Sequence, residues 1–99
     1  MNKYINLTCL IADDFSTTRR IIKKALNDLG FNCLEAENGV EALAIIQQLT
    51  LDLVIADAHM PEKNGLDLLE NIRANDNFKD LPVVLTMIEP LEELISEGE

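Results

Sequence analysis

Basic and aromatic side chains are scarce in this sequence of 99 residues, which has 8 Lys and Arg against 18 Asp and Glu and no tryptophan. The net charge of −10 repels phosphate backbones and acidic lipids, so we expect no binding to nucleic acid or membranes. With so few aromatic rings, the core must consist mainly of Leu, Ile, Val and Ala. Solubility explains part of the acidity, but some acids occupy positions where solubility does not need them.

No apolar run approaches the roughly 20 residues that span a bilayer, and residues 1–6 lack the apolar stretch of a signal peptide. We therefore expect a cytoplasmic protein. Cys9 and Cys33 lie in apolar stretches without a C-x-x-C pair or a Cys/His cluster, which argues against zinc binding and redox chemistry. In a reducing compartment both are expected to be small buried hydrophobic residues.

Strand-like and helix-like patterns alternate along the chain without repeats or a flexible linker, and a chain of this length closes a single core, so we expect one domain over residues 1–99. Ser16 and Gly30 are the expected cap and end of a first helix, and Asn38 is the expected cap of a second helix through Leu49. Strands are expected over 5–12, 32–36, 51–56 and 82–87, and two further helices over 66–73 and 91–96.

This alternation predicts parallel strands joined by right-handed crossovers, and therefore an open α/β sheet with helices on both faces. The almost wholly apolar third strand suits a central position that is covered on both sides. In the third helix, the spacing of Leu66, Leu69 and Ile72 predicts that these three side chains lie on one side.

Three of the apolar runs stop on small polar residues: 7–12 on Asp13 and Asp14, 53–56 on Asp57, and 83–85 on Thr86. Ligands of parallel sheets bind outside the carboxyl ends of the strands, where the strand order reverses. Three carboxylates would repel one another there unless a cation offsets them, and Mg2+ suits carboxylates, water and phosphate oxygens. Asp57 can then act as a nucleophile toward a phosphoryl group, with Thr86 donating a hydrogen bond to it.

The chain resembles the receiver domains of two-component response regulators, and within them the chemotaxis type. The resemblance implies a flavodoxin-like open parallel sheet with strand order 2-1-3-4-5. Receiver domains are themselves an example of the rule that ligands bind where the strand order reverses, so that rule and the resemblance are not independent evidence. The matching motifs are IADD (11–14), FSTTRR (15–20), ENGVEAL (37–43), the loop Asp57-x-x-Met60-Pro61-x-x-x-Gly65, and LPVVLT (81–86).

Carried over to this sequence, the resemblance implies that Asp57 accepts a phosphoryl group from a histidine kinase or a small phosphodonor. The receiver itself catalyses its phosphorylation and dephosphorylation, and is not an enzyme in the usual sense. Asp14 and Asp57 would bind Mg2+ directly, Asp13 largely through water, and His59 through its backbone carbonyl. Thr86 would contact the phosphoryl group. The His59 side chain either tunes the lifetime of the aspartyl phosphate or is a solvated bystander.

Two departures from the family pattern affect the functional expectations. Met87 stands where receivers usually have Ala or Gly, and a longer side chain there narrows access for bulky donors. Only 13 residues follow Thr86, enough for a fourth helix but not for the fifth strand, its lysine and the fifth helix. We therefore expect a C-terminally incomplete receiver with impaired signalling, and association through strand four, as a dimer or by segment exchange. The alternative is that the chain is a fragment of a longer receiver.

Several functions are compatible with this pattern. The first is a phosphoacceptor of a chemotaxis system, whose partners would be the kinase and a flagellar motor switch protein. The second is an interaction module of receiver fold that no longer signals by phosphate. A phosphatase of the haloacid-dehalogenase type would need a second acid in Asp57-Ala58-His59, and this acid is absent. Flavin binding would need a Ser/Thr-rich phosphate loop after the first strand, where this sequence has Asp13-Asp14-Phe15.

Overall fold

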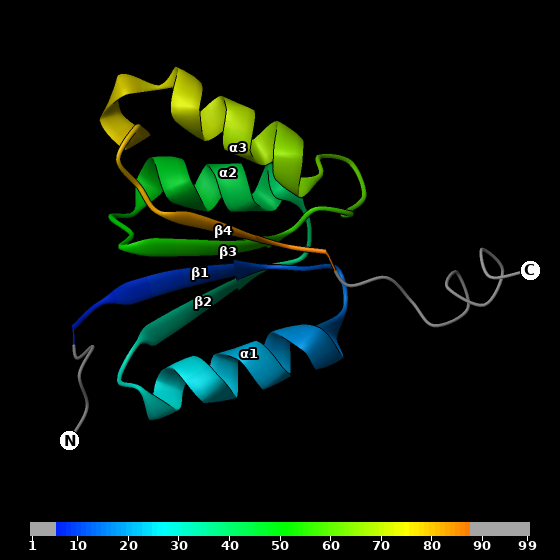
Figure 1. Cartoon of the computed structure of the whole chain (residues 1–99), viewed down its shortest axis with the longest axis vertical. Helices are drawn as coiled ribbons and strands as arrows, with labels where there is room; N and C mark the ends of the chain where they lie inside the picture. Colours follow the sequence, from blue (N-terminus) through cyan, green and yellow to red (C-terminus); the bar gives the residue numbers. More distant parts are fainter. Residues whose placement is uncertain (1–5, 88–99) are drawn as a thin grey trace, which may run out of the picture.

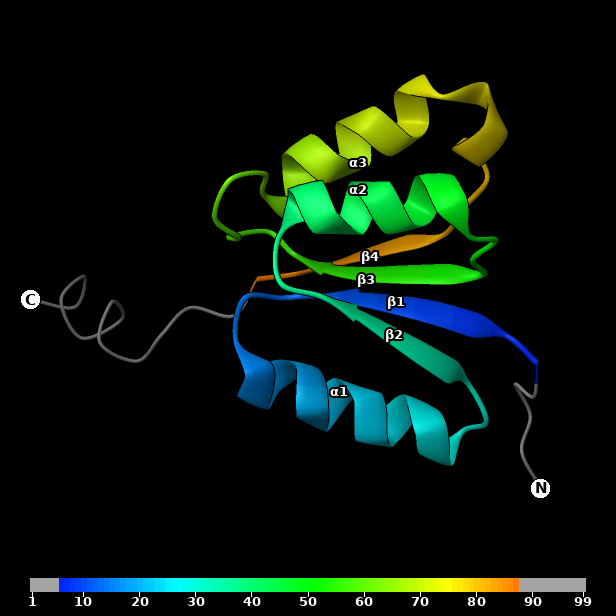
Figure 2. The ribbon, with the colours of Figure 1, turned by 180° about the vertical axis from the view of Figure 1, so that it is seen from behind.

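A four-stranded parallel sheet forms the centre of the structure, a computed structural model that describes residues 6–87 (Figure 1). Helix α1 covers one face of the sheet, and helices α2 and α3 cover the other. The view from behind shows the same three layers (Figure 2). The elements are β1 (Thr8–Ala12), α1 (Ser16–Asp28), β2 (Asn32–Ala36), α2 (Gly39–Gln48), β3 (Leu53–Asp57), α3 (Gly65–Ala74), the 3-10 turn η1 (Asp76–Phe78) and β4 (Val83–Thr86).

The sheet has the order β2-β1-β3-β4, which confirms the predicted open α/β architecture and the 2-1-3-4 part of the receiver order. The chain moves from β1 to one side, then returns across β1 to place β3 on its other side, so the order reverses between β1 and β3. The predicted helix over 91–96 lies outside the described residues. Within 6–87, no helix is long and apolar enough to cross a bilayer.

The main hydrophobic core lies between the sheet and helices α2 and α3. Leu10 and Val54 from the sheet are fully buried there against Ile46 of α2 and Leu68 and Ile72 of α3. Aliphatic side chains of this kind fill the core as the shortage of aromatic residues predicts, and their removal from water is the main source of stability.

The two cysteines lie on neighbouring strands, where Cys9 of β1 is paired in register with Cys33 of β2. Both are free thiols; Cys9 is fully buried, as predicted, whereas Cys33 is half-buried. Burial raises the pKa of the Cys9 thiol to about 12. Since the thiolate is the reactive form, Cys9 is chemically inert at neutral pH.

The ends of helix α1 confirm one prediction and correct another. Gly30 has a φ of 104°, a left-handed conformation that favours glycine, and it ends the helix as expected. Ser16, however, is not the cap: it is the first helical residue, and the cap position belongs to Phe15, which has no side-chain capping bond. The carboxylate of Asp13 accepts the Phe15 N–H at 2.9 Å, so the turn before the helix is closed by the Asp13 side chain.

The second helix is capped as predicted, because the Asn38 side chain accepts the Glu41 N–H at 2.8 Å. The side of α3 that carries Leu66, Leu69 and Ile72 is not buried as a whole. Leu66 is 55% exposed, whereas Leu68 is fully buried. Helix α3 starts at Gly65, directly against the end of β3, and this contact sets which face of the helix meets the sheet.

Strand lengths differ from the predictions at their ends. Strand β2 has the predicted bounds, but β1 begins at Thr8, β3 runs from Leu53 through Asp57, and β4 covers only Val83–Thr86. Asp57 is therefore the last residue of β3 rather than the first residue after it. Its backbone position is set by sheet pairing, since it is paired in register with Thr86.

Candidate functional site

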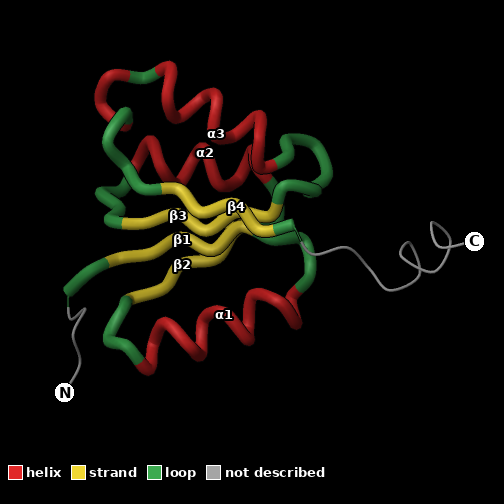
Figure 3. The backbone as a smooth tube through the Cα atoms, viewed as in Figure 1, coloured by secondary structure: helices red, strands yellow, loops and turns green. Residues whose placement is uncertain are grey.

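Three carboxylates gather where β1 and β3 end, as the sequence predicted. Ala12 of β1 is paired with Ala56 of β3, so Asp13 and Asp57 follow side by side at the same edge of the sheet. Each of Asp13, Asp14 and Asp57 offers a carboxylate oxygen within 4.8 Å of the other two. Asp13 and Asp57 are buried, whereas Asp14 is exposed. Figure 3 shows the loops after β1 and β3 leaving the same end of the sheet.

Two local turns hold the buried acids. Oδ1 of Asp13 accepts the Phe15 N–H, and Oδ1 of Asp57 accepts the His59 N–H, both at 2.9 Å. Both bonds have the i to i+2 geometry that aspartate commonly forms at turns. Within residues 6–87, neither acid uses its other oxygen, Oδ2, in a hydrogen bond. Each turn therefore orients its carboxylate and leaves an oxygen for another ligand.

The electrostatics of the cluster favour a bound cation. Burial raises the pKa of Asp13, the Phe15 N–H lowers it, and the neighbouring charges of Asp57 and Asp14 raise it further. Ionising all three acids together is thus costly without a counter-charge. Hard oxygen donors at this mutual spacing fit Mg2+, which is held by a few carboxylates together with water.

Thr86 and His59 complete the set of predicted residues. Thr86 lies beside Asp57 because the two are register partners, and the Ala58 N–H continues the ladder with a 2.8 Å bond to the Thr86 carbonyl. Side chains of register partners leave a sheet on the same face, so the half-buried Thr86 is suited to reach a group on Asp57. The His59 side chain is exposed, and its use of a carbonyl oxygen as a ligand stays a prediction.

Gly65 has a role that its place in the motif does not reveal. A Cβ at this position would lie 2.5 Å from the Asp57 carbonyl oxygen and 2.9 Å from its carbonyl carbon. Only glycine lets α3 start this close to Asp57. The motif includes Gly65, but the contact itself depends on how α3 packs against β3.

We expect Gly65→Ala to destabilise the fold. Crowding a packed site costs about 1 to 3 kcal/mol, and because the clash is with backbone atoms that cannot move aside, we expect the cost to outweigh the gain of at most about 1 kcal/mol that alanine brings to a helix. Urea unfolding followed by circular dichroism measures the effect. Leu66→Ala is the matched control, because this neighbouring side chain is exposed and its loss should change stability little. Equal stability of Gly65→Ala and the native chain would contradict the close contact.

Arg19 is the second residue whose contact with the site the sequence does not reveal. It reaches from α1 to the backbone of Asp13, and its Nη1 donates to the Asp13 carbonyl at 2.6 Å. Arg19 and Arg20 are adjacent and identical in type, but Arg19 is buried and Arg20 is exposed. The rotation of α1 against the sheet makes this distinction, and no local pattern reports it.

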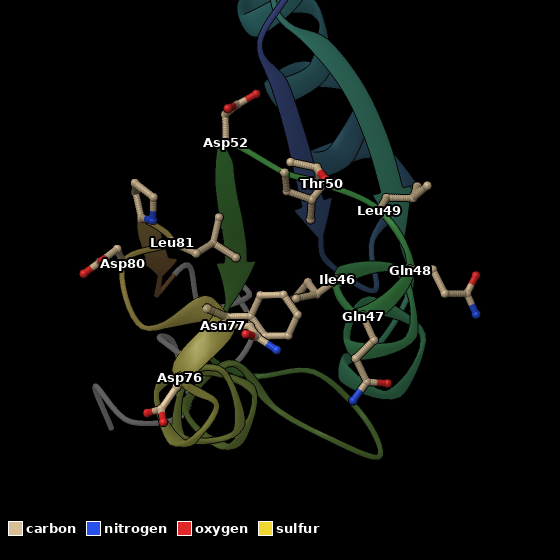
Figure 4. A pocket seen from close by; sticks show the side chains of 13 residues that line it. Ile46, Gln47, Gln48, Leu49, Thr50, Asp52, Asp76, Asn77, Asp80 and Leu81 are labelled. Carbon is tan, nitrogen blue, oxygen red and sulfur yellow. The ribbon is translucent and has the colours of Figure 1, made fainter.

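A groove of about 530 Å3 lies at the other end of β3 and β4, away from the acid cluster (Figure 4). Ile46, Phe78 and Leu81 contribute apolar atoms to it. One of its acids, Asp52, is already engaged, because it accepts the Thr8 N–H at 2.8 Å. Within residues 6–87, Asp13, Asp14 and Asp57 are the one group of at least three possible metal ligands that lie close together, so the carboxylate edge is the candidate site.

Comparison with protein families matches residues 9–96 to the response regulator receiver domain. The chain belongs to this family. The match agrees with the strand order and with the acids at the ends of β1 and β3, and it sets aside the phosphatase and flavin-binding alternatives.

Among curated proteins, this receiver domain is similar to chemotaxis protein CheY-3 of Vibrio cholerae, with 47% identity over 94 residues covering 94% of this chain and 72% of that protein. It is 45% identical over 90 residues to chemotaxis protein CheY of Pseudomonas aeruginosa, covering 90% of this chain and 73% of that protein. The high identity over most of both chains is the basis for comparing the functional residues.

Solved structures give the same answer for the fold. The N-terminal domain of a response regulator receiver protein from Methanoculleus marisnigri has a TM-score of 0.79 and 28% identity, covering 94% of this chain and 77% of that one. Chemotaxis response regulator CheY4 of Vibrio cholerae has a TM-score of 0.77 and 26% identity, covering 93% and 78%. The receiver fold is therefore confirmed by backbone geometry as well as by sequence.

Proposed function

We propose that this receiver domain accepts a phosphoryl group on Asp57 from a histidine kinase, with Mg2+ as cofactor, in a cytoplasmic chemotaxis pathway. The observation that carries the proposal is the convergence of Asp13, Asp14 and Asp57 at one edge of the sheet, with Thr86 beside the acceptor. Three oxygen ligands and a hydroxyl in this arrangement match what phosphoryl transfer needs, which is positioning and charge neutralisation.

In the proposed transfer, a carboxylate oxygen of Asp57 attacks the phosphorus of a phosphohistidine. The new O–P bond forms as the N–P bond breaks, and the electron pair returns to the imidazole nitrogen, which takes a proton from water. Mg2+ supplies positive charge that offsets the carboxylates and the phosphoryl oxygens. Asp14 and Asp57 would bind the ion directly, Asp13 largely through water, and His59 through its carbonyl, while Thr86 donates to a phosphoryl oxygen.

The proposed partners follow from the relatives. The similar proteins are named as chemotaxis proteins, which supports a chemotaxis kinase as donor and a flagellar motor switch protein as target. The net charge of −10 supports a protein partner rather than nucleic acid or a lipid surface.

Beryllofluoride, which mimics a phosphoryl group on aspartate, tests the proposed site. We expect amide NMR signals around Asp57 and Thr86 to shift when beryllofluoride is added with Mg2+, and not when either component is omitted. NMR is preferable to fluorescence because the chain has no tryptophan. Absence of any Mg2+-dependent shift would overturn the proposal and favour the alternative, an interaction module that no longer signals by phosphate.

The His59→Ala variant tests the possible tuning role of His59. The structure engages the backbone amide of His59 with Asp57 and leaves the imidazole exposed, so we expect little change in the autodephosphorylation rate. Loss of the phosphoryl group is followed by mass spectrometry after removal of the donor. A clear change in that rate would assign the imidazole a role near the attacking water.

Association through β4 stays a prediction, and the position of β4 in the sheet supports it. Within the described residues, β4 is hydrogen-bonded to β3 on one side only, and its Val84 is 49% exposed. An unpaired edge strand is a template for another chain. We expect sedimentation velocity at micromolar concentration to show a dimer that Val84→Lys weakens, and a well-folded native monomer would contradict this.

A further inference from the structure

Arg19 occupies an unusual environment for a cation. It is one of three buried charged residues in the described part of the chain, and the other two are the site acids Asp13 and Asp57. Arginine is rarely buried unless its charge is paired. From α1 it contacts Asp13, which follows β1, and Glu35 of β2, so it lies next to the acid cluster.

The guanidinium joins two strands. Nη1 donates to the Asp13 carbonyl at 2.6 Å, Nε donates to Oε1 of Glu35 at 3.0 Å, and Nη2 lies 3.9 Å from Oε1 of Glu37. Glu35 is itself bound by Lys23 at 3.3 Å. Arginine suits this task because its planar fork makes several directed hydrogen bonds at once, which a lysine ammonium cannot reproduce.

The bond to the Asp13 carbonyl acts on the peptide that joins Asp13 to Asp14. The same residue is held at its N–H by the Ala36 carbonyl at 3.1 Å, and at its carboxylate by the Phe15 N–H. With Arg19, all three polar groups of Asp13 are engaged. Because rotation of this peptide would move both acids relative to Asp57, its orientation sets the geometry of the ligand cluster.

We propose that Arg19 is a positioning residue for the metal site, which presets the carboxylates of Asp13 and Asp14 by clamping the Asp13 carbonyl to β2. This inference rests on the proposed function, since it concerns the same acids. Arg19 bonds to the backbone of Asp13 rather than to a carboxylate of the acid cluster. Groups that orient metal ligands in this way commonly change metal affinity by 10-fold to 100-fold when removed.

Mg2+ titration of the purified chain by NMR tests the proposal, at a temperature where each variant is folded. We expect Arg19→Gln to bind Mg2+ about 10-fold more weakly than the native chain. Arg20→Gln is the matched control: it removes the same charge from the adjacent, exposed position and should bind nearly as the native chain does. Equal Mg2+ affinity of Arg19→Gln and Arg20→Gln would overturn the proposal.

Glu35→Gln separates positioning from stability. It removes the charge of the partner and lowers the stability of the fold, but the amide oxygen of the glutamine can still accept the Arg19 Nε–H, so the clamp from Asp13 to β2 is kept and Mg2+ affinity should stay near native. A loss of affinity as large as that of Arg19→Gln would show that stability alone is responsible, and would overturn the proposal.

If Arg19→Gln does not fold, Arg19→Lys replaces it. The lysine keeps the charge but cannot hold Asp13 and Glu35 together, so we expect weaker Mg2+ binding from it as well, and native affinity would overturn the proposal. Failure of the native chain to bind Mg2+ would overturn both the proposed function and this inference. If the native chain binds Mg2+ and the Arg19 variant binds it with the same affinity, this inference alone is overturned.

Discussion

Asp57→Asn is expected to abolish uptake of a phosphoryl group from acetyl phosphate and Mg2+. The amide has nearly the shape of the carboxylate and can still accept the His59 N–H, but it is not nucleophilic and carries no charge for a metal. Intact-protein mass spectrometry measures the phosphorylated fraction, and sensitivity of the label to hydroxylamine identifies an acyl phosphate.

Asp52→Asn is the matched control for this variant. Asp52 precedes β3 at the opposite end from Asp57, and an amide oxygen can replace its carboxylate as acceptor for the Thr8 N–H. The control should therefore take up phosphate as the native chain does. Hydroxylamine-sensitive label on Asp57→Asn would move the acceptor to another acid, and loss of label from both variants would point to damage to the fold.

Asp13→Asn is expected to raise stability while lowering Mg2+ affinity. Burial and the charges of Asp57 and Asp14 raise the pKa of Asp13 in the folded chain, so its ionisation at neutral pH destabilises the metal-free protein. The neutral amide removes this cost and can keep the bond from the Phe15 N–H. We therefore expect a higher free energy of unfolding at pH 7 for Asp13→Asn than for the native chain.

The sign of the pH dependence provides the check. A raised pKa in the fold means that the native chain loses stability as pH rises through that pKa, and regains it below the pKa of the unfolded chain. The advantage of Asp13→Asn should therefore be largest near neutral pH and vanish in acid. Urea unfolding in EDTA across this range measures it.

Asp14→Asn is the control for the Asp13 prediction. Asp14 belongs to the same ligand cluster but is exposed, so its replacement should weaken Mg2+ binding with a smaller gain in stability. A loss of stability in Asp13→Asn at neutral pH would contradict the electrostatic account of the cluster.

Much of the fold could be predicted because the signals are local. The bounds of β2, the Asn38 cap and the Gly30 end of α1 depend on neighbouring residues, and all three are confirmed. The cap of α1 was predicted wrongly because the helix begins one residue earlier than expected, with Phe15 at the cap position and the Phe15 carbonyl accepting the Arg19 N–H. Strand ends were also less predictable, since pairing with a neighbouring strand decides where a strand stops.

The sequence predicted the residues of the candidate site at the strand ends but not the contacts that helices make with them. Apolar runs that stop on Asp13, Asp57 and Thr86 placed these residues at one edge of a parallel sheet, and the register pairs confirm that placement. The close approach of Gly65 to Asp57 and the clamp of Arg19 on Asp13 were missed. Both depend on how a helix is rotated against the sheet, which the packing of distant residues sets.

By itself, the sequence determined the order of strands and helices and the residues at the strand ends, because hydrophobic periodicity and turn chemistry act within a few residues. The tertiary structure decided that three carboxylates come within 4.8 Å of one another, that Leu68 rather than Leu66 is buried, and that Arg19 rather than Arg20 reaches the site. These outcomes depend on contacts between elements far apart in the chain. Only the assembled sheet and its packed helices bring such elements together.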